Sequence, residues 1–269
     1  MTNPTNEESW DALSEYYQTE ICISLDDVHY GPYGPGEKEL GIIGGVQDLD
    51  VLELVCGGGQ NIIVLKKWGA RTAVGFDNSE SQLNYARKLA KSHKVDVRFV
   101  KGNMEGLSDF DDSTFDLVVS SHAMNYVNDI QAVFNESSRV MRTGGRIVVC
   151  ITHPIWNVVA DALEGRALCE LKNYFMLDRE SWDWTDYSGN KIASFESTPW
   201  RLDQIINGLI KSGLTIELVR EPRGYTITEM EEIGFDNVPY YEERQFDARF
   251  VESNLVVPNS LIVSAKKES

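Results

Sequence analysis

The sequence predicts an α/β fold, because one stretch of it alternates between the two patterns that such folds require. Val51–Val55 is a short apolar run of the kind found in buried parallel strands. Asn61–Trp68 then carries apolar residues at helical spacing, and Thr72–Phe76 is a second strand-like run. Three consecutive glycines, Gly57 to Gly59, separate the first strand from the helix. A glycine turn at this place lets the backbone bend sharply or lets a ligand lie against it.

An acidic residue follows the glycine turn at a distance that indicates a nucleoside site. Asp77 stands at the carboxyl end of the second strand, about 20 residues after the turn, where its two oxygens can accept hydrogen bonds from two ribose hydroxyls. The spacing excludes a dinucleotide fingerprint, because position 62 would have to be glycine and is Ile62. It also excludes a P-loop, because no Gly-Lys-Ser/Thr sequence follows.

Two motifs in this stretch resemble a known family. ELVCGGG, Glu53–Gly59, resembles motif I (E/D-x-G-x-G-x-G) of class I S-adenosylmethionine-dependent methyltransferases, and GFDNSESQLNYAR, Gly75–Arg87, resembles their motif II. The resemblance continues as motifs in the right order from about Val51 to Thr152. One position departs from the pattern. Val55 stands where the family has its first motif glycine, and its side chain would crowd the cofactor or be strained at positive φ.

The resemblance implies a Rossmann-like seven-stranded sheet of order 3-2-1-4-5-7-6, with strand 7 antiparallel and helices on both faces. We expect an N-terminal helical cap at residues 1–45, a core at 46–153 and 200–269, and a lid or substrate insertion at 154–199, within one domain overall. The remaining core elements are expected as strands at 95–100, 114–120, 146–151, 214–219 and 259–265, and as helices at 79–93, 130–141 and 202–212. Ser79 is the expected N-cap of the first of these helices.

The N-terminal region reads as a helix, a loop and a second helix. Trp10 and Tyr17 fall at helical spacing, residues 25–40 alternate glycine and proline as a loop does, and residues 37–45 are expected to form a helix. In related methyltransferases such a helix and loop cover the cofactor. The resemblance therefore implies that Tyr16 or Tyr17, and the stretch His29–Gly31 with Tyr30, lie near its methionine end. An ordinary packing helix followed by a surface turn is the alternative, and the sequence leaves both open.

The resemblance names S-adenosylmethionine as the cofactor. Asn103 takes the place of the acid that usually holds the adenine amine, and its amide oxygen can still accept that hydrogen bond. Met104 offers a polarizable surface to the adenine ring. The expected cofactor-binding residues are Tyr17, Tyr30, Glu53, Val55, Cys56, Gly57, Gly59, Asp77, Asn78, Gln82, Asn103, Met104 and Ser120.

Two histidines are candidates for a catalytic base on the acceptor side. His153 ends the fifth strand, and the carboxyl ends of such strands face the ligand crevice. A histidine there can take a proton near neutral pH, although it can equally serve only to bond a loop carbonyl. His122, in the loop after the fourth strand, is the second candidate. The insertion at 155–199 is rich in aromatic residues and has no strong strand or helix period, apart from a helix expected over 158–171. Residues 220–258 form a long segment with a helical period only near 228–233, which we interpret as a second lid piece or a partner surface.

Composition limits the function classes. The 269 residues include 42 acids and 25 bases, for a net charge of -17, which argues against a nucleic-acid partner. No apolar run is long enough for a membrane span, and the polar N-terminus lacks a secretory signal, so we expect a cytoplasmic protein. The four cysteines form no C-x-x-C pair, and no metal site is expected. The oligomeric state stays open.

The sequence thus predicts S-adenosylmethionine-dependent methyl transfer to an O, N or C nucleophile of a small molecule. The family signatures for methylation of nucleic-acid bases and of protein arginine are missing. A non-catalytic binding or regulatory protein with the same fold is one alternative, which Val55 and Asn103 favour. An aminopropyltransferase is the other. It would need acids after the fourth strand, where Ser120, Ser121 and His122 stand instead.

Overall fold

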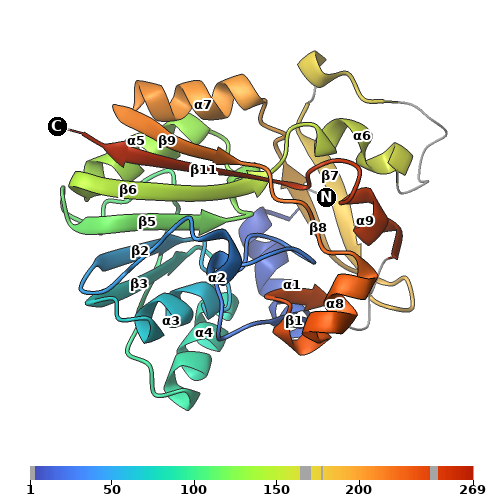
Figure 1. Cartoon of the computed structure of the whole chain (residues 1–269), viewed down its shortest axis with the longest axis horizontal. Helices are drawn as coiled ribbons and strands as arrows, with labels where there is room; N and C mark the ends of the chain where they lie inside the picture. Colours follow the sequence, from blue (N-terminus) through green and yellow to red (C-terminus); the bar gives the residue numbers. More distant parts are fainter. Residues whose placement is uncertain (1–3, 164–170, 177, 243–247, 269) are drawn as a thin grey trace.

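A seven-stranded sheet crosses the centre of the protein in the computed structural model, which describes residues 4–163, 171–176, 178–242 and 248–268 (Figure 1). Its strands are β2 (Asp50–Leu54), β3 (Thr72–Asp77), β4 (Arg98–Lys101), β5 (Phe115–Ser121), β6 (Met141–Thr152), β9 (Leu214–Arg220) and β11 (Ser260–Lys267). They lie in the order β4-β3-β2-β5-β6-β11-β9, and β11 runs antiparallel to both its neighbours. In chain order this is 3-2-1-4-5-7-6, which confirms the predicted topology.

Alternation along β2 explains how the sheet buries both of its faces. Val51 joins an apolar cluster that contains residues of α3 (Gln60–Lys67). Leu52 and Leu54 point the other way, into a cluster with residues of α5 (Ile130–Val140) and α7 (Leu202–Lys211). Because successive side chains of a strand face opposite sides, one five-residue strand contributes to both halves of the core. Helices therefore cover both faces, as predicted.

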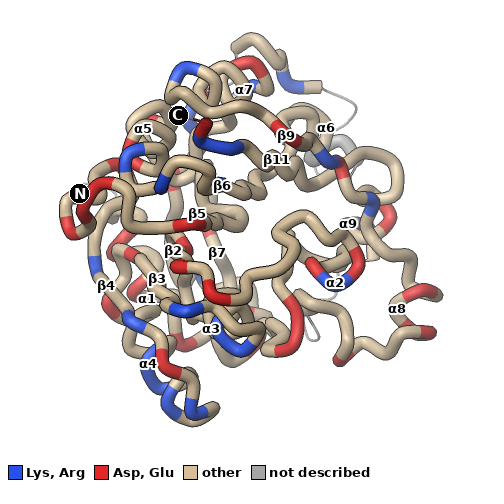
Figure 2. Tube along the Cα trace, turned by 60° about the vertical axis from the view of Figure 1, so that its left-hand side comes forward, with Lys and Arg blue, Asp and Glu red and all other residues tan. Residues whose placement is uncertain are grey.

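The second crossover helix, α4 (Glu80–Ser92), begins where the sequence predicts. The Ser79 hydroxyl accepts a hydrogen bond from the backbone N–H of Gln82 at 3.2 Å, which confirms Ser79 as the N-cap. Leu83, Ala86 and Ala90 form the buried stripe of this helix. Its outer face carries lysines and arginines, whereas acids gather on α8 (Ile227–Ile233) (Figure 2).

The N-terminal helix, α1 (Asn6–Glu20), lies across the carboxyl ends of the strands, where it contacts α4 and β8. Thr5 and Glu8 form a capping box that fixes its start. A short strand, β1 (Ile21–Ile23), follows at once. The predicted helix around Trp10 and Tyr17 is thus confirmed.

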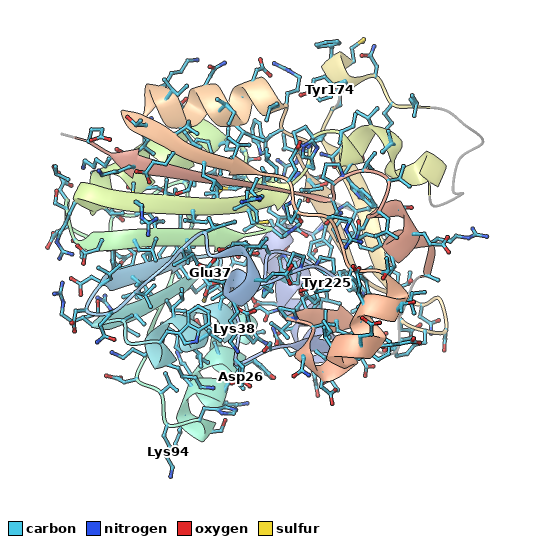
Figure 3. The ribbon with its side chains drawn as sticks, in the orientation of Figure 1. Asp26, Glu37, Lys38, Lys94, Tyr174 and Tyr225 are labelled. Carbon is cyan, nitrogen blue, oxygen red and sulfur yellow. The ribbon has the colours of Figure 1, made fainter. Side chains whose placement is uncertain are left out.

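The helix predicted over residues 37–45 is wrong beyond its first turn. The observed α2 covers only Glu37–Leu40 and ends at Gly41, which has φ +61°. The buried Glu37 carboxylate explains the early end, because it accepts hydrogen bonds from the backbone of Ile42 and Gly44 and from the Tyr30 hydroxyl at 2.6 Å. Outside this bend, the Tyr225 hydroxyl donates to Glu39 of α2 (Figure 3).

The aromatic insertion contains a β-hairpin that the sequence reading missed. Its strands, β7 (Glu180–Thr185) and β8 (Lys191–Ser197), pair antiparallel. β8 packs on α1, so the insertion and the N-terminal helix share one small core around Leu13 and Phe195. The helix predicted over 158–171 is α6 (Trp156–Leu163), and residues 164–170 lie outside the described residues. A single 3-10 turn, η2 (Tyr174–Met176), follows.

The long segment before β11 is more structured than predicted. It contains α8 (Ile227–Ile233), η3 (Phe235–Asn237), β10 (Tyr240–Glu242) and α9 (Ala248–Ser253). β10 pairs antiparallel with β1, which places Tyr240 opposite Ile23. Segments from near the two ends of the chain therefore meet beyond the carboxyl ends of the central strands (Figure 1). The 3-10 turn η1 (Met124–Tyr126) follows β5. The division of the chain into cap, core and insertion stays a prediction.

Candidate functional site

The glycine turn between β2 and α3 is held in an unusual backbone conformation. Gly57 and Gly59 have φ of +50° and +79°, a region that glycine adopts without strain. Val55 has φ +54°, which costs a β-branched residue about 1–2 kcal/mol. The Cys56 N–H donates to the carbonyl of Phe76 at 3.0 Å, so the turn is tied to β3. The structure thus forces Val55 into the backbone geometry of the glycine it replaces in the motif.

Asp77 closes this turn from the end of β3. One carboxylate oxygen accepts a hydrogen bond from the Gly57 N–H and the other accepts one from the Ser79 N–H, both at 2.8 Å. The residue is only 3% exposed, and burial raises the pKa of its carboxyl to about 6. Asp77 therefore both shapes the turn and presents a carboxylate to the space above it.

Glu53 is a second buried acid beside the same turn. It lies on β2, is 3% exposed, and accepts a hydrogen bond from the Ile62 N–H at the start of α3 at 3.0 Å. Burial, with a smaller contribution from the charge of Asp77, raises the pKa of Glu53 to about 8. Two enclosed carboxyls with raised pKa values would be stabilised in their charged form by a cationic ligand.

Three glutamines connect the N-terminal helix to the glycine turn. The Gln60 amide donates to Gln18 at 2.7 Å, and the Gln18 amide donates to Gln82 at 2.8 Å. This Gln18–Gln60–Gln82 chain is buried and lies directly over Gly58, where an added β-carbon would come within 2.6 Å of the Gln18 carboxamide carbon. Only glycine at position 58 leaves room for the chain.

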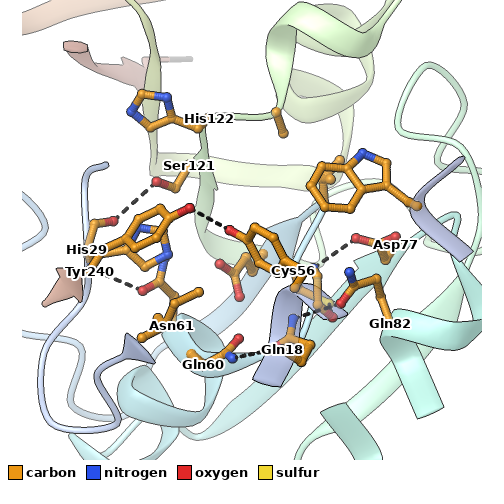
Figure 4. A pocket seen from close by; sticks show the side chains of 18 of the residues that line it. Gln18, His29, Cys56, Gln60, Asn61, Asp77, Gln82, Ser121, His122 and Tyr240 are labelled. Atoms are coloured by element: carbon orange, nitrogen blue, oxygen red, sulfur yellow. Dashed lines mark hydrogen bonds between the residues drawn. The ribbon is translucent and has the colours of Figure 1, made fainter. Parts of the chain in front are cut away.

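These groups surround a cavity of about 240 Å³ at the carboxyl ends of β2, β3 and β5 (Figure 4). Of the predicted site residues, Tyr17, Glu53, Val55, Cys56, Gly57, Asp77, Gln82 and His122 line it. His29, from the stretch expected near the methionine end of the cofactor, lines it as well. The cavity is also lined by residues that the predictions had not included, namely Trp10, Gln18, Ile23, Pro32, Gly58, Gln60, Asn61, Ser121, Ala123, Tyr126, Thr152, Trp184 and Tyr240. Among the described residues, no lysine or arginine lines this cavity.

Figure 4 shows Asp77 and Gln82 on one side of the cavity and His29, His122 and Tyr240 on the other. The Tyr240 hydroxyl forms a hydrogen bond of 2.8 Å with the Tyr17 hydroxyl, which joins β10 to α1 across the cavity. The backbone N–H of His29 donates to the side chain of Asn61 at 3.0 Å. Aromatic and neutral polar groups therefore face the acidic side.

A second cavity, of about 440 Å³, adjoins the first. The predicted adenine-side residues Asn78, Asn103 and Met104 line it. Trp10, Val55 and Tyr126 line both cavities, and the rings of Trp10 and Tyr126 meet edge to face with centroids 5.8 Å apart. The Val55 side chain, together with two aromatic rings, thus lies where the two cavities meet.

The structure places four predicted residues outside both cavities. Tyr30 bonds Glu37, and Gly59 packs closely on α4, where a β-carbon would lie 2.9 Å from that of Ala86. Ser120 is buried and its hydroxyl has no partner among the described residues. His153 accepts a hydrogen bond from the Ile155 N–H on Nδ1 and donates one of 2.7 Å from Nε2 to the Glu221 carboxylate. The roles predicted for these residues stay predictions.

Some of the additional lining residues had a sequence signal and others had none. Gln60 and Asn61 follow the glycine turn directly, so their position on the first turn of α3 could have been inferred. Tyr240 and Trp184 come from segments without a readable period, and only tertiary pairing brings them to the site. Within the described ranges, no group of three or more histidine, cysteine or acidic residues is arranged to hold a metal ion, and no helix is long and apolar enough to cross a membrane.

Comparison with known proteins matches the central part of the chain to one family. Residues 52–149 match the family model described as "Methyltransferase domain". The uncharacterized methyltransferase YbaJ of Bacillus subtilis (strain 168) is 34% identical over 128 residues, which is 48% of this chain and 50% of that protein. The demethylmenaquinone methyltransferase of Lactococcus lactis subsp. lactis (strain IL1403) is 30% identical over 165 residues, which is 55% of this chain and 65% of that protein.

A solved structure shares the fold over a larger part of the chain. The crystal structure of an S-adenosylmethionine-dependent methyltransferase from Mesorhizobium loti superposes with a TM-score of 0.61 and 23% identity. The superposition covers 82% of this chain and 92% of that one. The chain spans 50% and 65% of the lengths of the two curated relatives. The family model matches residues 52–149, which include the glycine turn and run from β2 into β6.

Proposed function

We propose that this chain, whose residues 52–149 form a methyltransferase domain of the class I S-adenosylmethionine-dependent fold, binds S-adenosylmethionine and methylates a small molecule. The observation that carries the proposal is the pairing of the glycine turn with Glu53 and Asp77 in one enclosed cavity. Burial raises the pKa of both carboxyls, so a cationic group beside them would stabilise their charged forms, and this ligand carries a sulfonium and an ammonium group.

The donor groups of the two cavities fit the parts of this cofactor. Asp77 accepts one backbone hydrogen bond on each oxygen, and a carboxylate has further lone pairs for the two hydroxyls of a ribose. Asn103 and Met104 stand in the adjoining cavity, where an adenine would find an amide and a polarizable surface. Glu53 and the Gln18–Gln60–Gln82 chain would face the amino-acid end.

When bound, the cofactor supplies a methyl group that its own positive charge activates. The residues of this chain therefore need to orient the acceptor and exclude water. α1, β1, β7 and β10 each contribute a residue to the cavity wall, namely Tyr17, Ile23, Trp184 and Tyr240. The aromatic rings among them suit a sulfonium, whose charge is stabilised by the faces of such rings.

The size and lining of the cavity support a small, largely uncharged acceptor. A volume of about 240 Å³ beside aromatic side chains suits a ring-sized molecule. The name of one relative, demethylmenaquinone methyltransferase, is consistent with an acceptor of that kind. An aminopropyltransferase would need acids on the acceptor side, but Glu53 and Asp77 are the acids among the described lining residues, and both lie at the glycine turn.

Calorimetric titration with S-adenosylmethionine and with S-adenosylhomocysteine tests the proposal. We expect both to bind, and Asp77→Asn to weaken binding at least about tenfold, which is about 1.4 kcal/mol. Asp96→Asn, an exposed acid just before β4, is the matched control and should bind like the wild type. If neither ligand binds the wild type, the proposal fails.

The same titration of Val55→Gly separates an enzyme from a binding protein that has only kept the fold. If wild type binds neither ligand and Val55→Gly binds both, Val55 closes the site and the non-catalytic reading is favoured. If both proteins bind, the valine fits beside the cofactor despite its strained backbone.

A further inference from the structure

Two of the four histidines of the chain, His29 and His122, stand on the acceptor side of the cavity. His29 lies in the loop after β1 and His122 follows β5, so segments 93 positions apart bring them together. Burial lowers the pKa of His122 to about 4 and that of His29 to about 3, the latter with a further contribution from His122. Both rings are therefore neutral at pH 7, and each has one nitrogen that donates and one that accepts.

The contacts of His122 assign its tautomer. Its Nε2 lies 3.3 Å from the carbonyl oxygen of Tyr30 and 2.9 Å from the hydroxyl of Ser260. The Ser260 hydroxyl donates its hydrogen to the same carbonyl at 3.0 Å. With the Ser260 hydroxyl donating to this carbonyl, the arrangement that satisfies all three groups places the hydrogen of the ring on Nε2 and leaves Nδ1 as an acceptor.

The packing of His122 closes off the Nε2 edge of its ring. Gly31 lies against this edge, where a β-carbon would come within 2.5 Å of Nε2 and 3.3 Å of Cδ2. Nδ1 has no hydrogen-bond partner among the described residues, although His122 is only half-buried and lines the cavity. The backbone of His122 has φ +52°, a strained conformation of the kind that gathers at functional sites.

His29 has the complementary arrangement. Its Nδ1 accepts the N–H of Gly31 at 3.4 Å, so the hydrogen of the neutral ring is on Nε2. Its ring packs edge to face on Tyr240, with centroids 5.1 Å apart, which fixes its plane. Nε2 has no partner within the described part of the chain. The two histidines thus offer one free donor and one free acceptor to the same cavity.

We propose that His29 and His122 form a subsite that selects a neutral hydroxyl group as the methyl acceptor. Nδ1 of His122 accepts the hydroxyl hydrogen, and Nε2–H of His29 donates to an oxygen of the acceptor. This inference rests on the proposed function and narrows its O, N or C nucleophile to oxygen. Two other acceptor groups fit the subsite less well. An ammonium has no lone pair to accept the hydrogen bond from His29. A carboxylate has no hydrogen to donate to His122, and it would stand in the same cavity as Glu53 and Asp77.

Histidine-selective ¹⁵N NMR tests the subsite, because the chain has only four histidines to assign. We expect His29 and His122 to give the signals of neutral, Nε2-protonated rings at pH 7. Phenol, titrated with and without saturating S-adenosylhomocysteine, should shift Nδ1 of His122 and Nε2 of His29. Anisole, in which a methyl group replaces the hydroxyl hydrogen, should leave Nδ1 of His122 in place. Benzylamine, which is an ammonium at this pH and has no lone pair to accept a hydrogen bond, should leave Nε2 of His29 in place.

Variants at position 122 give a second readout. His122→Gly removes the acceptor without backbone strain and should weaken phenol binding at least about fivefold. His122→Asn keeps an acceptor oxygen and tolerates positive φ, so it should recover much of that affinity. His93→Gln, at the exposed C-terminal end of α4, is the control and should bind phenol like the wild type.

Either of two results would overturn the subsite: anisole shifting His122 as phenol does, or phenol leaving both histidines unmoved. Because phenol is titrated both with and without S-adenosylhomocysteine, the result can be read whether or not the cofactor binds. If the cofactor binds but phenol shifts neither histidine signal, the subsite is refuted and the proposed function still holds. Failure of the cofactor itself to bind refutes the proposed function instead.

Discussion

Burial raises the pKa of Glu53 to about 8 because its carboxyl is almost fully enclosed, and only the Ile62 N–H and the Asn61 side chain oppose the shift. In the unfolded chain the same group has an ordinary pKa near 4.5. Between these two values the folded protein binds a proton that the unfolded chain has released. Protonation of Glu53 therefore stabilises the ligand-free fold below about pH 4.5, and this stabilisation is lost as the pH rises through about 8.

We predict that this loss can be measured between pH 6.5 and 8.5. Asp77, with a pKa of about 6, has mostly titrated below that window, and so have His29 and His122. Over the window the free energy of unfolding of the ligand-free protein should fall by about 1–2 kcal/mol more in the wild type than in Glu53→Gln. Urea denaturation of both proteins at each pH provides the measurement.

Glu53→Gln is a suitable reference because its carbonyl can still accept the hydrogen bond from the Ile62 N–H. Parallel pH profiles for the two proteins would contradict a raised pKa at Glu53. Saturation with S-adenosylmethionine should abolish the difference in slope, because a bound cation favours the charged carboxylate.

At the level of single residues, the sequence predicts what is local. Gly57, Glu53 and Asp77 are found from one stretch because strand, turn and strand end are set by neighbours in the chain. Gln18 and Tyr240 are brought to the site by α1 and by the β1–β10 pair, and no local pattern announces either contact. Resemblance to the family motifs supplied the positions, whereas the partners of each position required the tertiary structure.

Among the elements, α1 is held to the core by the Gln18–Gln60–Gln82 chain, which joins it to α3 and α4. The chain lies over Gly58, whose missing side chain leaves the space that the Gln18 carboxamide fills. The position of α1, and with it of Trp10 and Tyr17, therefore depends on one glycine of the cofactor turn.

We predict that Gly58→Ala displaces α1. The added methyl would lie 2.6 Å from the carboxamide carbon of Gln18, so the side chain must leave and its two hydrogen bonds break. Amide hydrogen exchange in α1 should become at least about tenfold faster, and affinity for S-adenosylhomocysteine should fall by a similar factor. Exchange mass spectrometry and calorimetry provide the two measurements.

Gly106→Ala is the matched control, because a β-carbon at position 106 meets no atom within 4 Å. The double variant Gln18→Ala with Gly58→Ala gives the sharper test. If the steric argument is right, it should behave like Gln18→Ala alone, since the clash partner is gone. Additive losses would show that Gly58 acts in some other way.

The hairpin β7–β8 shows why one element was missed. Trp182 and Trp184 alternate with polar residues, as a half-buried strand requires, and a turn at 186–190 follows. Aspartate stands between the two tryptophans, and serine and threonine flank them, so this strand forms no continuous apolar run in the sequence. The partner surface that gives the hairpin its apolar side, α1, comes from about 170 positions earlier in the chain.

At the scale of the whole molecule, segments from near both ends of the chain build the wall of the cavity. β1 and β10 pair antiparallel, with Ile23 opposite Tyr240 and Cys22 opposite Tyr241. Ile23 and Tyr240 line the cavity, and Tyr240 also bonds Tyr17. The order of the sheet followed from the resemblance, whereas this closure did not, because short strands paired across more than 200 residues leave no local pattern.

We predict that ligands reach the cavity by separation of β1 from β10. In Tyr241→Cys, the new thiol stands opposite Cys22, an exposed cysteine that forms no disulfide within the described residues, and oxidation should link the two strands. The rates at which S-adenosylhomocysteine binds and leaves should then both fall at least about tenfold, while the reduced form exchanges freely. Stopped-flow fluorescence of the tryptophans that line the cavity can follow both forms.

The reduced form of the same variant controls for the loss of the tyrosine ring, which stacks on Phe235 with centroids 4.9 Å apart. Cys22→Ser with Tyr241→Cys removes the link and should be insensitive to oxidation. Unchanged rates in the cross-linked protein would mean that ligands pass on the other side, between α1 and the hairpin. If instead the oxidised protein retains its bound ligand, the opening through which ligands pass lies between β1 and β10. One disulfide across this short strand pair would then control access to the site.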